Sequence, residues 1–426
     1  MKWLTGNTEE ILTALNEEAK LTQVDNQKVE EQVRQIIQAV IQNGDQALKA
    51  YSRKFDQVTL QDLSISKETI DLAYQRVEIE VIKALEAAKE NIVSYHQKQK
   101  QHDFMDTEKK GVLRGQLVLP LARVGVYVPG GTAAYPSSVL MNVLPAKIAG
   151  VKEIIMVTPP SDEGIPDVIL AAAKVAGVDK IFQVGGAQGI AALAYGTETV
   201  PKVDKIVGPG NIYVATAKKQ VFGTVGIDMI AGPSEIGILA DETANPVYIA
   251  ADLLSQAEHD TLARAILITN SPNLATQVEK EIVRQLATLP RKQIAEQAIQ
   301  NHGRIIVVAT VEEMFTIMNE IAPEHLEVQL TDPISYLHEI KNAGSIFLGE
   351  YASEPVGDYF SGTNHVLPTS GTAKFYSPLG VYDFVKYSQV TYYTKEALAD
   401  AKDAITILAR KEGLEAHARA VECRFN

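Results

Sequence analysis

Apolar residues in the first 100 positions recur at the spacing of a helix. Between residues 29 and 40 they lie three or four positions apart, and the polar triplet at 43–45 interrupts them. A second apolar stripe runs from residue 67 to residue 98. The spacing predicts two scaffold helices, preceded by an N-terminal arm of 20 residues with one helix.

Short apolar runs alternate with helical stripes from residue 115 onward. The expected strands are 117–119, 124–128, 153–158, 180–184, 204–207, 236–240, 265–269, 304–309 and 345–348. The expected helices are 137–149, 165–176, 188–195, 211–221, 245–258, 271–289 and 311–321. This alternation is typical of βαβ units and predicts an α/β chain built on parallel sheets, with helices on both faces.

Changes in this pattern divide the chain into segments. Glycine-containing stretches near residues 125 and 232 mark two seams, and after residue 377 the pattern predicts a helical tail with a break at Gly413. We therefore expect an arm (1–20), a discontinuous α/β domain (21–124 and 233–376), an inserted α/β domain (125–232) and a C-terminal tail (377–426).

Composition limits the class of protein. A chain of 426 residues is too long for one ordinary core, and 46% hydrophobic with 22% charged residues is typical of a globular protein. The net charge of −13 and the lack of a basic stripe argue against nucleic-acid binding. No apolar run reaches the length of about 20 residues that spans a membrane, and no signal peptide is evident. Cys423 is the only cysteine, which fits a cytoplasmic protein.

Three glycine-containing loops follow predicted strands and precede predicted helices, at residues 129–132, 185–188 and 208–211. Glycine lets the backbone approach a ligand, and a helix N-terminus favours anions, so these loops suit a phosphate or a dinucleotide. Tyr127, Gln188 and Asn211 lie at their edges and could contact a cofactor. None of the loops matches G-x-G-x-x-G, and plain tight turns remain an alternative.

Four side chains from three segments could form a metal site. Gln256 and His259 are three positions apart and share one face of a helix. Asp358 and His417 would complete a set of nitrogen and oxygen ligands, which is compatible with zinc and also with manganese or cobalt. His365 competes with His417 as a ligand, and ordinary surface positions remain an alternative for these residues.

The Glu324-His325 pair is the candidate for acid/base chemistry, because Glu and His are the usual groups that transfer protons in enzymes. The pair follows Pro323, so we expect a defined and exposed turn. Cys423 is a poor candidate nucleophile, because no neighbouring His or helix start would lower its pKa.

Taken together, these segments resemble the histidinol dehydrogenase family over nearly the whole chain. The motifs are G-V-Y-V-P-G-G at 125–131, V-G-G-A-Q at 184–188, V-G-P-G-N at 207–211, A-G-P-S-E at 231–235, L-L-S-Q-A-E-H at 253–259, P-E-H-L at 323–326 and G-D-Y-x-S-G-T-N-H-V-L-P at 357–368. Each motif alone is weak, but their combination and order are specific.

The resemblance implies a fold and an activity. The fold would contain two Rossmann-like three-layer domains, similar to aldehyde dehydrogenases. The inserted domain would bind NAD, and the discontinuous domain would carry the metal and acid/base residues. The enzyme would oxidise L-histidinol through the aldehyde to L-histidine with two NAD and one zinc per subunit, in the last step of histidine biosynthesis.

The resemblance also implies roles for individual residues. Glu324 and His325 would be catalytic, and Tyr127, Gln188 and Asn211 would bind NAD. The metal ligands would be Gln256, His259, Asp358 and His417. The substrate would contact Ser234, Gln256, His259, His325, Asp358, Glu412 and His417. In the implied homodimer the tail completes the partner's active site; Glu415 is a rival for the role of Glu412 because the motif around it is loose.

Other readings of the residues remain open. The nearest is a related zinc and NAD dehydrogenase of another amino alcohol or a sulfonated alcohol. A zinc hydrolase would use Glu324 to activate water and would need no nucleotide. A non-catalytic α/β ligand-binding module would leave the Glu-His pair without a purpose.

Overall fold

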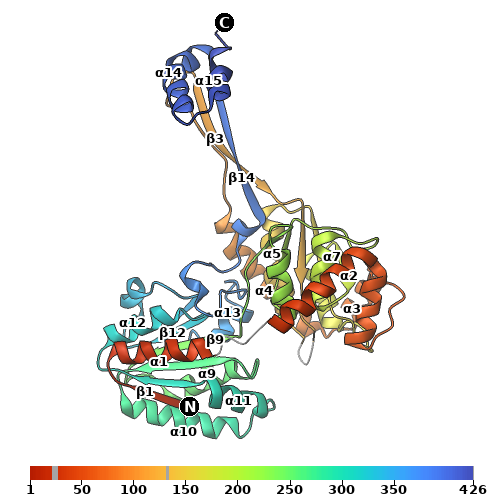
Figure 1. Cartoon of the computed structure of the whole chain (residues 1–426). Coiled ribbons are helices and arrows are strands. Elements are labelled where there is room, and N and C mark those ends of the chain that lie inside the picture. Colours follow the sequence, from red (N-terminus) through yellow and green to blue (C-terminus); the bar gives the residue numbers. More distant parts are fainter. Residues whose placement is uncertain (22–26, 131–133, 426) are drawn as a thin grey trace.

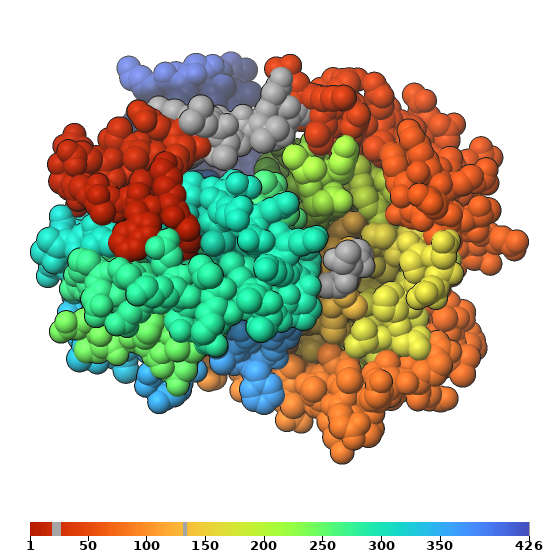
Figure 2. Space-filling view, turned by 90° about the horizontal axis from the view of Figure 1, so that it is seen from below, coloured from red at the N-terminus to blue at the C-terminus, as the bar shows by residue number. Residues whose placement is uncertain are grey.

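The computed structural model describes residues 1–21, 27–130 and 134–425. Within them, two parallel sheets form two bodies that lie side by side, and a three-stranded antiparallel sheet projects away from both (Figure 1). Figure 2 views the molecule from below and shows the six-stranded body, mainly green and cyan, beside the five-stranded body, mainly yellow and orange. The predicted α/β class is confirmed.

The five-stranded sheet has the order β6-β5-β4-β7-β8. Its strands are β4 (Arg123–Tyr127), β5 (Glu153–Thr158), β6 (Lys180–Gln183), β7 (Lys205–Val207) and β8 (Gly226–Ile227). The helices between them are α5 (Pro136–Ala149), α6 (Asp167–Ala176), α7 (Gly186–Tyr195) and α8 (Ile212–Val221). Apolar side chains on both faces of the sheet are buried, which is why its strands are continuous apolar runs in the sequence.

Three helices from the first 100 residues cover the five-stranded sheet. They are α2 (Gln27–Tyr51), α3 (Lys67–Arg76) and α4 (Ile79–His96). Helix α2 packs on α7 and α8, α3 packs on α6, and α4 packs on α5. The expectation that residues 21–124 join residues 233–376 in one domain is therefore wrong for these helices. An apolar stripe shows that a helix is covered but does not identify the surface that covers it.

The six-stranded sheet has the order β1-β11-β10-β9-β12-β13. Its strands are β1 (Lys2–Thr5), β9 (Glu235–Ala240), β10 (Arg264–Thr269), β11 (Arg304–Val307), β12 (His325–Gln329) and β13 (Ser345–Leu348). Its helices are α1 (Thr8–Leu21), α9 (Pro246–Ala257), α10 (Pro272–Leu286), α11 (Lys292–His302), α12 (Val311–Ile321) and α13 (Glu354–Tyr359). The N-terminal arm is part of this body, because β1 pairs with β11 and α1 packs on α12.

The expected helical tail begins instead with a strand. Strand β14 (Val385–Tyr393) pairs antiparallel with β3 (Val112–Pro120), and β2 (Phe104–Asp106) pairs with the other edge of β3. Helices α14 (Lys395–Lys411) and α15 (Glu415–Glu422) follow, separated near Gly413 as expected. Figure 1 shows that the paired strands β3 and β14 hold these two helices well away from both bodies.

Several predicted boundaries change. The stripe at 67–98 forms two helices because Val77 is extended, whereas the break expected at Gly44 is a kink within α2. Helix α11 and strand β12 were not predicted.

The short helices are η1 (Ser52–Asp56), η2 (Gln97–Gln99), η3 (Pro333–Glu339), η4 (Thr372–Lys374) and η5 (Val381–Phe384). Among the described residues, no helix is both long and apolar enough to cross a bilayer.

Candidate active site between the two bodies

The candidate site lies where the two parallel sheets present opposite ends to each other. The second and third glycine loops follow the carboxyl ends of β6 and β7, whereas Glu235 and His325 begin β9 and β12. A cavity of about 80 Å³ is lined from both bodies, by Gly208 and Pro209 on one side and by Ser234 and Glu324 on the other. Residues on two separately folded sheets therefore face one space.

His325 has one ring nitrogen fixed and one available. Its Nδ1 lies 3.0 Å from the carbonyl oxygen of Glu235, which can only accept a hydrogen bond, so Nδ1 carries a proton. Its Nε2 is buried and has no hydrogen-bond partner among the described residues. The tautomer set by the backbone thus leaves Nε2 as the atom that can exchange a proton with a ligand.

Glu324 is also buried, contrary to the exposed turn expected for it. Its Oε2 accepts a hydrogen bond of 2.9 Å from the backbone N–H of Glu235 and lies 3.6 Å from His325 Nδ1. The expectation failed because β12 is an internal strand of the sheet, between β9 and β13. Burial raises the pKa of Glu324 to about 7, even though the charge of His325 opposes this rise. A carboxyl of this kind can donate or accept a proton near neutral pH.

Carboxylates surround the other side of the His325 ring. Its Nε2 lies 3.8 Å from Asp358 Oδ1 and 4.0 Å from Glu354 Oε1. Burial alone would lower the pKa of His325, but Glu324, Asp358 and Glu354 outweigh it and raise that pKa to about 10. The ring is therefore cationic at neutral pH unless these negative charges are offset.

His259, Glu354 and Asp358 each offer one atom to a common space, and these three atoms lie within 4.8 Å of one another. Gln256, one turn earlier on α9, is buried, and its Oε1 has no hydrogen-bond partner within the described parts of the chain. An unpartnered buried oxygen is costly unless a ligand satisfies it. This set of nitrogen and oxygen donors fits a divalent cation such as zinc.

The ionisation of these side chains also suits a metal. Burial would raise the pKa of Asp358, but the imidazoles of His325 and His365 lower it well below its usual range. Burial lowers the pKa of His259, so its imidazole is neutral and can bind a metal. Burial, together with the charge of Asp358, raises the pKa of Glu354 to about 8.

His365, the rival ligand, is held by protein contacts. Its Nδ1 lies 3.2 Å from the carbonyl oxygen of Asp358, and its Nε2 lies 3.3 Å from Ser138 Oγ at the start of α5. The imidazole therefore connects α5 of the five-stranded body with the end of α13.

The predicted cofactor residues gather around the glycine loops. Tyr127 is buried, and its hydroxyl accepts a hydrogen bond of 3.1 Å from the backbone N–H of Gly186. Gln188 is buried in the first turn of α7, and Asn211 caps α8 by accepting from the N–H groups of Tyr213 and Val214. The loop at 129–132 is described only as far as Gly130, since its remaining residues lie outside the described chain.

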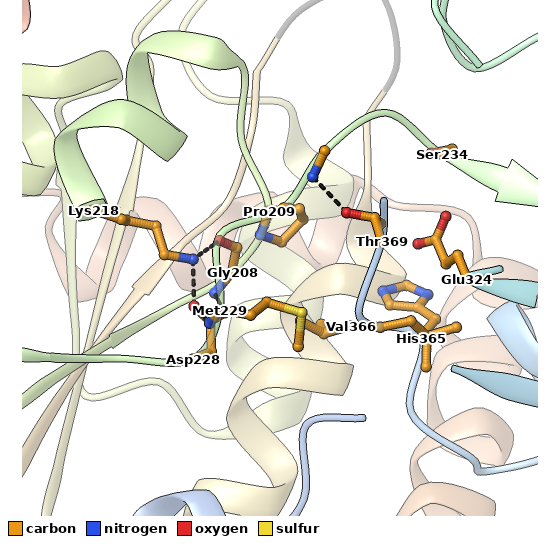
Figure 3. A pocket seen from close by; sticks show the side chains of 13 residues that line it. Gly208, Pro209, Lys218, Asp228, Met229, Ser234, Glu324, His365, Val366 and Thr369 are labelled. Atoms are coloured by element: carbon orange, nitrogen blue, oxygen red, sulfur yellow. Dashed lines mark hydrogen bonds and ion pairs between the residues drawn. The ribbon is translucent and has the colours of Figure 1, made fainter. Parts of the chain in front are cut away.

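A buried ion pair supports the Gly208 loop. Lys218 pairs with Asp228, and its Nζ donates a hydrogen bond of 3.0 Å to the carbonyl oxygen of Gly208. Asp228 accepts from the N–H of Gly208 at 2.8 Å. At Gly208 (φ +112°) a Cβ would lie 2.1 Å from the carbonyl oxygen of Tyr127, so only glycine fits. Figure 3 shows this pair on one side of the pocket and Glu324 with His365 on the other.

Two predicted site residues lie apart from this cluster. Glu412 ends α14 and His417 is on α15, and both are exposed on the projecting tail (Figure 1). Glu415 forms ion pairs with Arg410 and Arg419, whereas no ion pair of Glu412 is found within the described residues. Of the two rivals, Glu412 is the one free to meet a ligand.

The sequence analysis missed four buried acids beside the site: Glu235, Asp252, Glu327 and Glu354. All four occupy strands or helices, where an isolated acid normally faces solvent. One signal was available for Glu354, because it lies four residues before Asp358 and so shares a helical face with it.

The fold and the site define a two-body α/β enzyme with a buried Glu-His pair beside a cluster of metal-binding side chains. A model of the histidinol dehydrogenase family matches residues 19–425. Histidinol dehydrogenases from Listeria innocua and Streptococcus mutans are 65% and 62% identical, over 100% of this chain and 99% of each relative. The chain belongs to the histidinol dehydrogenase family and is an oxidoreductase.

A solved structure agrees with this assignment. The crystal structure of the histidinol dehydrogenase from Elizabethkingia anophelis matches with a TM-score of 0.92 and 38% sequence identity. The match covers 100% of this chain and 98% of that chain. The likeness therefore extends over both bodies and the projecting tail.

Proposed function

We propose that this protein is a zinc-dependent dehydrogenase that oxidises L-histidinol through L-histidinaldehyde to L-histidine with two NAD, in the last step of histidine biosynthesis. It would act in the cytoplasm. The observation that carries the proposal is the convergence of Glu324 and His325 with the His259, Glu354 and Asp358 cluster, on a chain of this family. The unpartnered Gln256 Oε1 supports a metal in that cluster.

Each cofactor supplies one kind of chemistry. Bound zinc would supply positive charge, which holds the amine and imidazole nitrogens of the substrate and offsets the carboxylates that raise the pKa of His325. Two NAD molecules in succession would each accept one hydride. Gln256, His259 and Asp358 are the proposed zinc ligands within one chain, with Glu354 as an additional candidate.

His325 is the proposed base for the first oxidation. Because Nδ1 donates to the Glu235 carbonyl, Nε2 receives the hydroxyl proton of histidinol as the hydride leaves the same carbon. The alcohol is thereby converted to an aldehyde, with one NADH and one proton released. The fixed ring orientation removes a rotation that would otherwise slow this step.

Glu324 is the proposed base for the hydration of the aldehyde. One of its oxygens accepts from the Glu235 N–H, and the carboxyl lines the cavity between the bodies. With a pKa of about 7 it can take a proton from water that attacks the aldehyde. His325 then removes one hydroxyl proton of the hydrate as the second hydride leaves, which yields the carboxylic acid, and this acid loses its remaining proton to give the carboxylate.

We also propose a homodimer in which the tail of one chain enters the site of the other. Glu412 and His417 cannot join the cluster of their own chain from their place on the projecting tail (Figure 1). Helix α14 exposes the apolar side chains of Ile407 and Leu408, which are 60% and 64% exposed. Exposed apolar surface on an extended arm is typical of an interface. His417 of the partner would then be the fourth zinc ligand, and Ser234 with Glu412 of the partner would contact the substrate.

The decisive experiment measures NADH formed per L-histidinol consumed to completion. Two NADH per substrate, lost with a chelator and restored by zinc, is the expected result. One NADH would refute the four-electron reaction, and none would refute the dehydrogenase itself. Glu324→Gln is the matched variant: it should still bind zinc but slow the overall oxidation, and wild-type turnover would remove its assigned role.

Complementation tests the tail separately. Homodimers of Glu324→Gln and homodimers of His417→Ala should each oxidise L-histidinol much more slowly than the wild type. Mixed dimers contain one site with both wild-type residues if the tail acts on the partner, so activity should return. Inactivity of verified heterodimers would contradict action in trans.

A further inference from the structure

Strand β12 has one polar and one apolar face, and both are buried. His325, Glu327 and Gln329 alternate along the strand and share one face. Leu326 and Val328 point the other way, into the apolar cluster that includes α12. Buried polar groups are costly unless they are hydrogen-bonded, so the hydrogen bonds that this row makes hold the neighbouring elements in place.

Glu327 joins this strand to the helix that holds Asp358. Its Oε1 accepts a hydrogen bond of 2.9 Å from the backbone N–H of Glu354, the first residue of α13. Asp358 lies four residues later on the same helix, one turn along. The contact therefore fixes the start of the short helix that presents both carboxyls to the candidate metal site.

The same row joins the strand to α9. Gln329 Nε2 donates to Glu327 Oε2 at 2.8 Å and to Asp252 Oδ2 at 3.1 Å. Asp252 lies one turn before Gln256 on α9. Glu327 is thus the central member of a buried network that reaches both helices that carry candidate metal ligands.

We propose that Glu327 is a positioning residue of the zinc site, which sets α13 and α9 at the separation that the zinc ion requires. Glu327 does not touch the ion. This inference rests on the proposed function, because it requires that the cluster bind zinc. Outer contacts of this kind typically change metal affinity by about 10- to 100-fold when they are removed.

Three substitutions of Glu327 distinguish the effects of removing its carboxylate, its charge and one methylene of its length. Glu327→Ala removes the contact, and zinc affinity should fall by about 10- to 100-fold. Glu327→Gln keeps an oxygen that can accept from the Glu354 N–H, so affinity should stay close to that of the wild type. Glu327→Asp keeps the carboxylate but is one methylene shorter, so it should also weaken zinc binding while the protein remains folded.

Val328→Ala is the matched control. Val328 is the next residue on the same strand, is fully buried and faces the opposite side. Its truncation should lower the melting temperature without changing the zinc dissociation constant.

The measurement is a competition titration of the metal-free full-length dimer with zinc and a chromophoric chelator, with circular dichroism to verify folding. Weak binding in the Ala and Asp variants, together with near-normal binding in the Gln variant and the Val328 control, would establish the role. Wild-type affinity in folded Glu327→Ala and Glu327→Asp, or equal weakening in Val328→Ala, would overturn it. If the wild type binds no zinc, the proposed zinc dependence fails as well, so the two failures are distinguishable.

Discussion

Replacing Glu324 with Gln should strongly change the proton affinity of its neighbour His325. The Glu324 Oε2 atom lies 3.6 Å from His325 Nδ1, and both side chains are buried. Glu324 is the largest of the charges that raise the pKa of His325 to about 10 against the opposing effect of burial. Glutamine preserves the shape and an oxygen for the Glu235 N–H while removing the charge.

The size of the effect follows from the distance. Two unit charges 3.6 Å apart attract by roughly 5 kcal/mol at an effective dielectric constant of about 20. Each 1.36 kcal/mol is about a tenfold change in proton binding, so His325 should bind its proton roughly 10³- to 10⁴-fold more weakly in the variant. In the metal-free variant, His325 should therefore lose its positive charge at a lower pH than in the metal-free wild type. Any stability that depends on this charge should be lost at that lower pH as well.

The assay is an NMR titration of the histidine ring protons in metal-free wild type and Glu324→Gln. His96 is the internal control: it is buried in the other body, with Nδ1 2.8 Å from the Ile92 carbonyl, and should titrate alike in both proteins. An unchanged titration of His325 would refute the reasoning, because it would mean that Glu324 is neutral over the range in which His325 titrates.

Three further predictions concern other parts of the chain. Lys218→Met should lower the free energy of unfolding in urea by about 3 to 5 kcal/mol, because Asp228 becomes a buried unpaired charge. Adding Asp228→Asn should recover part of this loss. The same loss in the single and the double variant would contradict the explanation. Burial raises the pKa of Asp56 to about 6. The folded state therefore binds the carboxyl proton of Asp56 more tightly than the unfolded chain does. The contribution of this carboxyl to stability falls as pH rises through about 6. Asp56→Asn should therefore raise the melting temperature at pH 8 but hardly at pH 4. Leu408→Asp on α14 should produce inactive monomers in sedimentation velocity, and an intact dimer would place the interface elsewhere.

Much of the fold was predictable because its strands are buried on both faces. Such strands appear in the sequence as short apolar runs between helical stripes, and most of the predicted ranges lie within a few residues of the observed ones. Strand β12 was missed because its buried polar face gives the sequence an alternating pattern that is typical of an exposed strand or turn. Strand β14 was missed because its partner β3 lies more than 260 positions earlier in the chain.

The candidate site was predictable where motifs bring reactive side chains together locally. Gln256 with His259 and Glu324 with His325 are each close in sequence, and the structure brings His259, Glu324 and His325 together with Asp358. Glu354 and Glu327 were not recognised, because only the folded chain shows that both carboxyls are buried, that of Glu354 beside Asp358 and that of Glu327 at the Glu354 N–H. The roles of all the predicted site residues remain predictions: Tyr127, Gln188, Asn211, Ser234, Gln256, His259, Glu324, His325, Asp358, Glu412 and His417.

The sequence by itself determined the α/β class, the order of its elements and the family, because periodicity and motifs are local properties of the chain. Only the tertiary structure decided that α2, α3 and α4 cover the five-stranded sheet and that the N-terminal arm completes the other one. It also decided which nitrogen of His325 carries the proton and how the neighbouring charges change its pKa. The physical reason is that burial, hydrogen-bond partners and electrostatic fields depend on residues far apart in the chain, which no local pattern specifies.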